Sequence, residues 1–90
     1  MAEIRIEHAE GDVWRVEVAE GGSSTEHRVT VTDAHRERFG GGADTERLLE
    51  ESFEFLLERE PKESILSTFE LPVIARYFPG YPEEIRRRVG

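Results

Sequence analysis

The chain of 90 residues contains no cysteine, which excludes disulfide bonds, thiolate catalysis and zinc sites built from thiolates. It also lacks any apolar run that approaches the length of a membrane span. The N-terminal stretch MAEIRIEHAE carries charge from its third residue, and we do not expect it to be a signal peptide. We therefore expect a cytoplasmic protein that does not cross a membrane.

Basic residues are scarce, because 12 lysines and arginines face 20 aspartates and glutamates, for a formal net charge of −8. Residues 1–32 contribute −4, residues 33–60 contribute −5 and residues 61–90 contribute +1. An acidic surface repels phosphate backbones, so nucleic-acid binding is disfavoured. The one basic cluster is Arg86, Arg87 and Arg88 in the C-terminal third.

Alternating apolar and polar residues in the first third predict an antiparallel sheet with one face in water. Residues 3–8, 12–18 and 26–31 alternate in this way. The sequence AEGD at 9–12 predicts a tight hairpin, and AEGGSST at 19–25 predicts a longer, flexible connection. We expect a three-stranded meander whose single apolar face needs a cover.

Helices are expected to supply that cover. Asp33 is expected to cap a short helix through AHRERF, which the glycines at 40–42 then end. Asp44 or Thr45 is expected to cap a long helix that runs to the boundary at Pro61. The apolar stripe of this 44–60 helix is the natural partner of the sheet and comprises Leu48, Leu49, Ser52, Phe53, Phe55, Leu56 and Leu57.

Prolines divide the last third, which predicts three short helical pieces. The first is KESILSTF at 62–69, and the other two begin near Pro72 and Pro82, since proline suits the first helical position. We expect an α+β fold in a single domain, 1–90, with the sheet in 1–32, helices in 33–60 and short proline-started helices in 61–90. In the second helical piece, helical spacing assigns one face to the core: Val73, Ile74, Tyr77 and Phe78.

Candidates for metal binding and catalysis are few. His8 and His27 are expected on the inner face of the sheet but at its opposite ends, with His35 in the next element, so we expect no shared metal site. The glycines at 40–42 lack the Lys-Ser/Thr of a phosphate loop. We expect no cofactor and assign no catalytic residue, and an enzyme is the less favoured class. None of the candidate serine nucleophiles lies in a glycine elbow: Ser52, Ser64 and Ser67.

Two charged patterns leave alternatives open. Along the 44–60 helix, a glutamate stripe is either a solvated face or a surface for a basic partner or cations: Glu46, Glu50, Glu54 and Glu58. The arginine cluster beside two tyrosines is either a weak phosphate- or RNA-contacting patch or the last turn of a helix, whose dipole favours cations. The candidate interaction surface comprises Tyr77, Tyr81, Arg86, Arg87 and Arg88.

The segment ESFEFLLEREPKESILSTFELPVIARYFPGYPEEI, 51–85, resembles the C-terminal half of a group of small bacterial proteins of unknown function. Their shared pattern is a SFxFLLERE helix, then SIL, then FxLxxIxxYFPxY. The resemblance implies a bacterial, cytoplasmic protein with a single domain, and it brings no activity and no site residue with it. The matching residues are Ser52, Phe53, Phe55, Leu56, Leu57, Glu58, Arg59, Glu60, Ser64, Ile65, Leu66, Phe69, Leu71, Ile74, Tyr77, Phe78, Pro79 and Tyr81.

Three hypotheses follow for function. The first is a small non-catalytic protein that works by protein–protein contact, including self-association as a homodimer, because the chain is short and its sheet has exposed edges. The second is an antitoxin-like, nucleic-acid-associated regulator that uses Arg86, Arg87 and Arg88. The third is a small enzyme, which requires a cleft containing a strongly shifted ionisable group.

Overall fold

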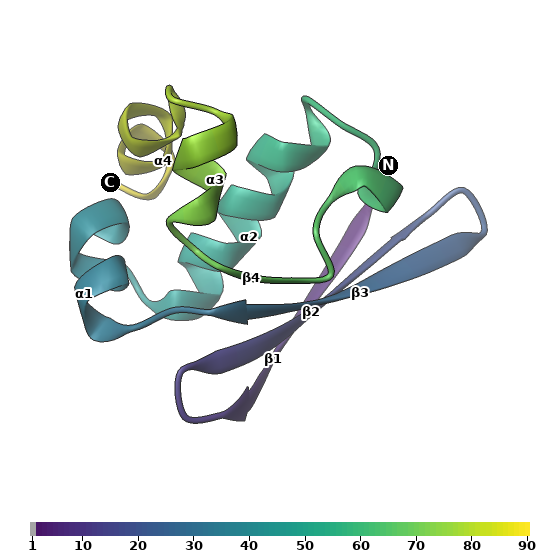
Figure 1. Cartoon of the computed structure of the whole chain (residues 1–90), viewed down its shortest axis with the longest axis horizontal. Helices are drawn as coiled ribbons and strands as arrows, with labels where there is room; N and C mark the ends of the chain where they lie inside the picture. The colour runs from purple at the N-terminus through teal and green to yellow at the C-terminus, as the bar shows by residue number, and fades with distance from the viewer. Residues whose placement is uncertain (1) are drawn as a thin grey trace.

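A computed structural model describes residues 2–90 and shows an α+β fold with two layers. One layer is a mixed, four-stranded sheet, and the helices lie on one side of it (Figure 1). The other side of the sheet faces outward and carries most of the strands' charged residues. The predicted α+β class is confirmed, and the prediction of three strands is wrong by one strand.

Three of the strands form an antiparallel meander: β1 (Glu3–Glu10), β2 (Val13–Glu20) and β3 (Ser23–Thr30). The tight hairpin expected between the first two is present. The connection expected to be long and flexible is also a two-residue turn, at Gly21 and Gly22, with φ of 66° and 83°. Glycine adopts these left-handed angles without strain, so the two strands extend to the turn.

The fourth strand, β4 (Thr68–Glu70), lies beside β3 and runs parallel to it. The predicted helix over 62–69 is therefore wrong. A single 3₁₀ turn, η2 (Lys62–Ser64), is followed by extended chain. Backbone bonds hold β4 in place at both ends: Arg28 N–H donates to Ser67 O at 2.7 Å, and Leu71 N–H donates to Thr30 O at 3.1 Å.

A short helical segment follows β3 and consists of α1 (Asp33–His35) and a π-helical turn, η1 (Arg36–Gly40). Its cap is Thr32 and not Asp33, because the Thr32 hydroxyl accepts the His35 N–H at 3.1 Å. The expected stop is present, since Gly41 ends the segment with a left-handed φ of 58°.

The main helix is α2 (Thr45–Leu57), and it begins at an Asp44 cap whose carboxylate accepts the Arg47 N–H at 2.8 Å. It ends three residues before the expected boundary at 60. Two helices complete the chain: α3 (Val73–Tyr77), after Pro72, and α4 (Tyr81–Val89), which has Pro82 in its first turn.

The core lies between the inner face of the sheet and α2. Val16, Val18 and Val29 of the sheet are fully buried there, together with Leu48, Leu49 and Phe53 of α2. A second set of aromatic rings joins α2 to the C-terminal helices, with Phe55 in edge-to-face contact with Phe78 and Tyr81. The C-terminal third is therefore fixed on the helical layer, which sets the position of α3 relative to β4.

Candidate functional site

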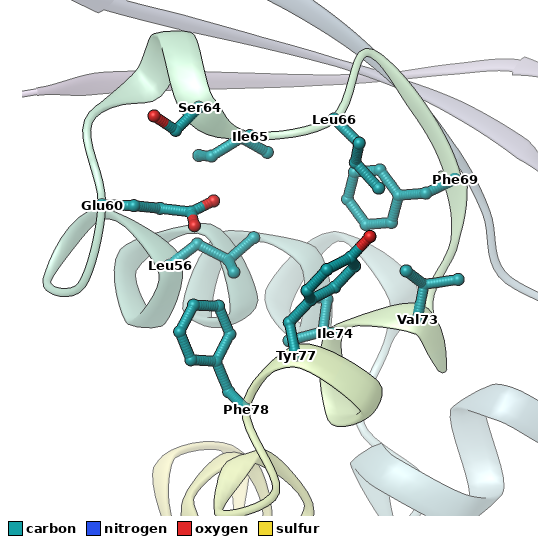
Figure 2. A pocket seen from close by; sticks show the side chains of 10 residues that line it. All are labelled: Leu56, Glu60, Ser64, Ile65, Leu66, Phe69, Val73, Ile74, Tyr77 and Phe78. Carbon is teal, nitrogen blue, oxygen red and sulfur yellow. The ribbon is translucent and has the colours of Figure 1, made fainter.

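A pocket of about 220 Å³ opens between the end of α2, the segment that follows it, and α3; we call it the groove (Figure 2). The chain leaves α2, passes Pro61 and η2, forms β4 along the edge of the sheet beside β3, and enters α3 after Pro72. Consecutive parts of one stretch of chain, residues 56–78, thus form its walls. The residues that line the groove are Leu56, Glu60, Ser64, Ile65, Leu66, Phe69, Val73, Ile74, Tyr77 and Phe78.

The groove gathers the exposed apolar surface of the protein. Among residues 2–90, the large apolar side chains that stand exposed are Leu66, at 45%, and Tyr77, at 66%, and both line the groove. Phe78 and Val73 beside them are only half-buried. Single exposed apolar residues are common, but a concave cluster of them is typical of a binding surface.

Glu60 is the one charged residue that lines the groove, and its side chain extends into the opening opposite Tyr77 (Figure 2). Partial burial beside apolar side chains raises the pKa of this carboxyl above its ordinary value. A cationic or N–H group that enters the groove could form an ion pair or a hydrogen bond with the Glu60 carboxylate. The groove is thus an apolar site with a single acidic contact.

His27 supports one wall of the groove from inside the core, where it is only 1% exposed. Because a carbonyl oxygen can only accept, His27 Nδ1–H donates to Leu66 O at 2.7 Å, and Nε2 is hydrogen-bonded to the Thr25 hydroxyl at 2.8 Å. Its ring also packs on Phe53, with centroids 5.3 Å apart. His27 thus joins β3 to the segment that presents Leu66.

The predicted separation of the histidines is wrong. β3 begins at Ser23, so His27 lies within the strand and not at its start. On the β2 strand between the two histidines, His27 is opposite Val16 and His8 is opposite Trp14, only two residues away, so they are not at opposite ends of the sheet. His8 is exposed, and its Nε2 contacts Gly11 O at 2.7 Å. Within residues 2–90, no group of three or more metal-ligating side chains could hold a metal ion.

Tyr81 does not belong to a surface, which corrects its place among the candidate interaction residues. Its side chain is fully buried, and its hydroxyl lies 2.6 Å from Ser52 Oγ on α2. Burial raises the pKa of its phenol. Tyr77, four residues earlier, was expected in the core with Ile74, yet it is exposed and belongs to the groove.

The C-terminal arginines make contacts within the protein. Arg86 donates to Arg38 O at 2.7 and 3.1 Å, and Arg87 pairs with Glu84 at 3.2 Å. Arg88 pairs with Glu84 at 3.0 Å and with Glu58 at 2.7 Å. The Arg88 hydrogen bond lowers the pKa of the Glu58 carboxyl. The cluster thus fastens α4 to α2 and η1, and the structure does not bring it together with Tyr77 in one site.

The sequence did not indicate Glu60, Leu66 or Phe69 as site residues. Leu66 and Phe69 were assigned to a helix, and Glu60 was one glutamate among many. The available signal was the Pro61 boundary followed by SILS, where an apolar pair stands between serines. That pattern fits an irregular segment with one apolar side chain left facing water.

A first prediction concerns Glu60, whose raised pKa means that ionisation is harder in the folded protein than in the unfolded chain. Ionisation therefore lowers stability as the pH rises through the carboxyl range. We expect Glu60→Gln to be more stable than the wild type at neutral pH, with the difference vanishing in acid. Chemical denaturation at a series of pH values measures this, and Glu20→Gln, at an exposed position of the hairpin, is the control. A Glu60→Gln variant that is less stable at neutral pH would contradict the assignment.

Comparison with known proteins adds no family: no family model, no curated protein and no solved structure matches the chain. The resemblance over 51–85 therefore stays a prediction. Within residues 2–90, none of the helices has both the length and the apolar character needed to cross a membrane.

Proposed function

We propose that this protein is a small, non-catalytic interaction module that binds a short segment of a partner protein in the groove. The observation that carries the proposal is the coincidence of three features in one concavity. Leu66 and Tyr77 are exposed there, and Glu60 reaches into the same opening. We further propose a cytoplasmic location, which suits a cysteine-free chain of this composition.

The size of the groove limits what it can hold. A volume of about 220 Å³ lies below the range of pockets that enclose drug-sized molecules, roughly 300–1,000 Å³. It accommodates one or two apolar side chains. This favours a peptide anchor over an enclosed cofactor or metabolite.

The chemistry of the lining defines the partner segment. Apolar walls from Phe69, Val73 and Tyr77 suit an aliphatic or aromatic anchor, and Tyr77 can bind it with little loss of side-chain entropy. Glu60 suits a lysine or arginine next to that anchor, and the net charge of −8 favours basic partners in general. The expected ligand is therefore a segment with a large apolar residue beside a basic one.

Selection from a random peptide library displayed on phage tests this proposal. We expect enrichment of peptides that combine an aromatic or aliphatic anchor with lysine or arginine one to four positions away. Selection on Leu66→Ser/Tyr77→Ser protein serves as the control and should not enrich the same peptides. Failure to enrich any consensus, or the same consensus on the control protein, would contradict the proposal.

The nucleic-acid alternative gains no support from the arginines it relies on. Arg86 and Arg88 are bound to a carbonyl and to two carboxylates of the protein, and releasing them for phosphate would weaken the attachment of α4. It remains the second hypothesis, and a gel-shift assay at low salt would test it.

A further inference from the structure

The first strand of the sheet has a free edge. In the order β1-β2-β3-β4, residues 3–10 of β1 pair with β2 on one side only, and no described residue pairs with the other side. This edge is eight residues long and contains no proline, and an open strand edge can pair with another chain. The opposite edge, β4, is only three residues long.

The hairpin register shows which backbone groups this edge presents. In a two-residue hairpin the residues that flank the turn exchange hydrogen bonds, and bonding then alternates along the strands. Glu20 and Ser23 flank the turn between β2 and β3 and form the first bonded pair. The backbone groups of the even-numbered residues of β2 therefore bond to β3, and the bond from Val31 N–H to Asp12 O fits this alternation. The backbone N–H and C=O groups of the odd-numbered residues of β2 point toward β1, where their register partners are Glu3, Arg5 and Glu7. The N–H and C=O groups that point outward belong to Ile4, Ile6 and His8.

The side chains of β1 are complementary to a second copy of the same strand. In an antiparallel pair centred on Ile6, outward-pointing residues meet one another, with Ile6 opposite Ile6 and Ile4 opposite His8. Arg5 then lies opposite Glu7 on both sides of the two-fold axis. These two side chains are 72% and 68% exposed. Within one copy Arg5 pairs with Glu3 at 3.5 Å and Glu7 pairs with Arg15, and exposed pairs of this kind are weak enough to exchange for pairs across the edge.

The neighbouring registers are less favourable. A pair centred on Arg5 places Arg5 opposite Arg5 and Glu3 opposite Glu7, and a pair centred on Glu7 places the two Glu7 side chains together. Like charges directly opposite each other destabilise a sheet. A pair centred on Ile4 matches Glu3 with Arg5 but overlaps over fewer residues. The bulge between His8 and Glu10 limits the overlap of the favoured register to residues 3–9.

We propose that two copies of the protein associate through β1 in the register centred on Ile6, which joins their sheets into one eight-stranded sheet. The pairing completes the backbone hydrogen bonds of both edges and forms two Arg5–Glu7 pairs. It also covers Ile4 and Ile6, which are only half-buried in the single copy. This surface is separate from the groove, so the proposal stands whether or not the groove binds a peptide.

Cysteine trapping tests the register, because the chain has no cysteine of its own. In the proposed pair the two Ile6 Cα atoms lie about 5.5 Å apart, within the range of a disulfide, whereas the two Ile4 Cα atoms are roughly 14 Å apart. We expect Ile6→Cys to form covalent dimers under mild oxidation several times faster than Ile4→Cys. Ser24→Cys, exposed at the far hairpin, measures random collisions. An Ile6→Cys rate equal to that of Ser24→Cys, or faster trapping at Ile4→Cys, would overturn the proposal.

Charge reversal tests the same pairing without a core residue. Glu7→Arg places an arginine opposite Arg5 at both sides of the two-fold axis, and we expect it to weaken dimerisation about tenfold in sedimentation experiments. The double variant Arg5→Glu/Glu7→Arg restores opposite charges across the interface and should recover most of that loss. Both variants lose the pairing of Glu7 with Arg15 within one copy, so the comparison between them isolates the contacts across the interface. Circular dichroism checks that each variant is folded. Equal association of all three proteins, or a wild type that stays monomeric up to high micromolar concentration, would contradict the proposal.

Discussion

Replacing Tyr81 with alanine is expected to lower the free energy of unfolding by about 3–5 kcal/mol, the usual cost of removing a buried aromatic side chain. The ring is fully buried between α4, α2 and η1, with its centroid 5.3 Å from that of Phe55 and 5.4 Å from that of Phe39. The chain has 90 residues and a correspondingly small reserve of stability, so the variant should be largely unfolded at moderate temperature. Urea denaturation followed by circular dichroism measures the change.

Two milder variants separate the contribution of the Tyr81 ring to stability from the contribution of its hydroxyl. Ser52→Ala leaves the buried Tyr81 hydroxyl without a partner and should cost about 1–3 kcal/mol. The double variant Ser52→Ala/Tyr81→Phe removes both polar groups, and we expect it to be more stable than Ser52→Ala alone. Tyr81→Ala with a loss below about 1 kcal/mol would show that the ring is not in the core.

Replacing His27 with alanine is expected to cost about 2–4 kcal/mol, because it creates a cavity next to Phe53 and removes two hydrogen bonds. The loss should exceed that of Thr25→Val, which removes one partner of the ring without creating a cavity. Chemical denaturation of both variants provides the comparison. Equal losses in the two variants would contradict the position of His27 in the core.

His27 also affects the shape of the groove, because it holds the segment that carries Leu66. Its bond to Leu66 O holds the wall that presents the Leu66 side chain. A His27→Gln variant retains both a donor and an acceptor and is the matched control. We expect His27→Ala, under conditions where it is still folded, to bind a selected peptide more weakly than His27→Gln. Hydrogen exchange at residues 64–67 should be faster in the alanine variant.

The local periodicity of the sequence predicted the elements that depend on neighbouring residues. Alternation identified the meander, and the apolar stripe identified the face of α2 that packs on it, since each signal lies within one element. The prediction of a long, flexible connection at 19–25 is wrong, because two glycines in the left-handed conformation, Gly21 and Gly22, form a compact two-residue turn.

The elements that depend on distant partners were not predictable in the same way. KESILSTF has apolar residues at helical spacing, and only the edge of β3, about 40 residues earlier in the chain, makes its second half a strand. Tyr77 and Tyr81 stand one helical turn apart in the sequence, yet one is exposed and the other buried. Tyr81 is buried because it contacts Ser52 and Phe55 on α2. The sequence around the two tyrosines does not show where these α2 residues lie.

The proposal that the groove binds a partner segment is tested most directly by calorimetry, in which a selected peptide is titrated into three proteins. The proteins are the wild type, Leu66→Ser/Tyr77→Ser in the groove, and Glu26→Ser/Arg28→Ser on the outer face of the sheet. Leu66 and Tyr77 are exposed, so the groove variant should keep nearly the wild-type free energy of unfolding. We predict that it binds at least about tenfold more weakly, while the outer-face variant binds like the wild type. Equal affinity of all three proteins, or a loss only in the outer-face variant, would contradict the assignment of the groove as the binding site.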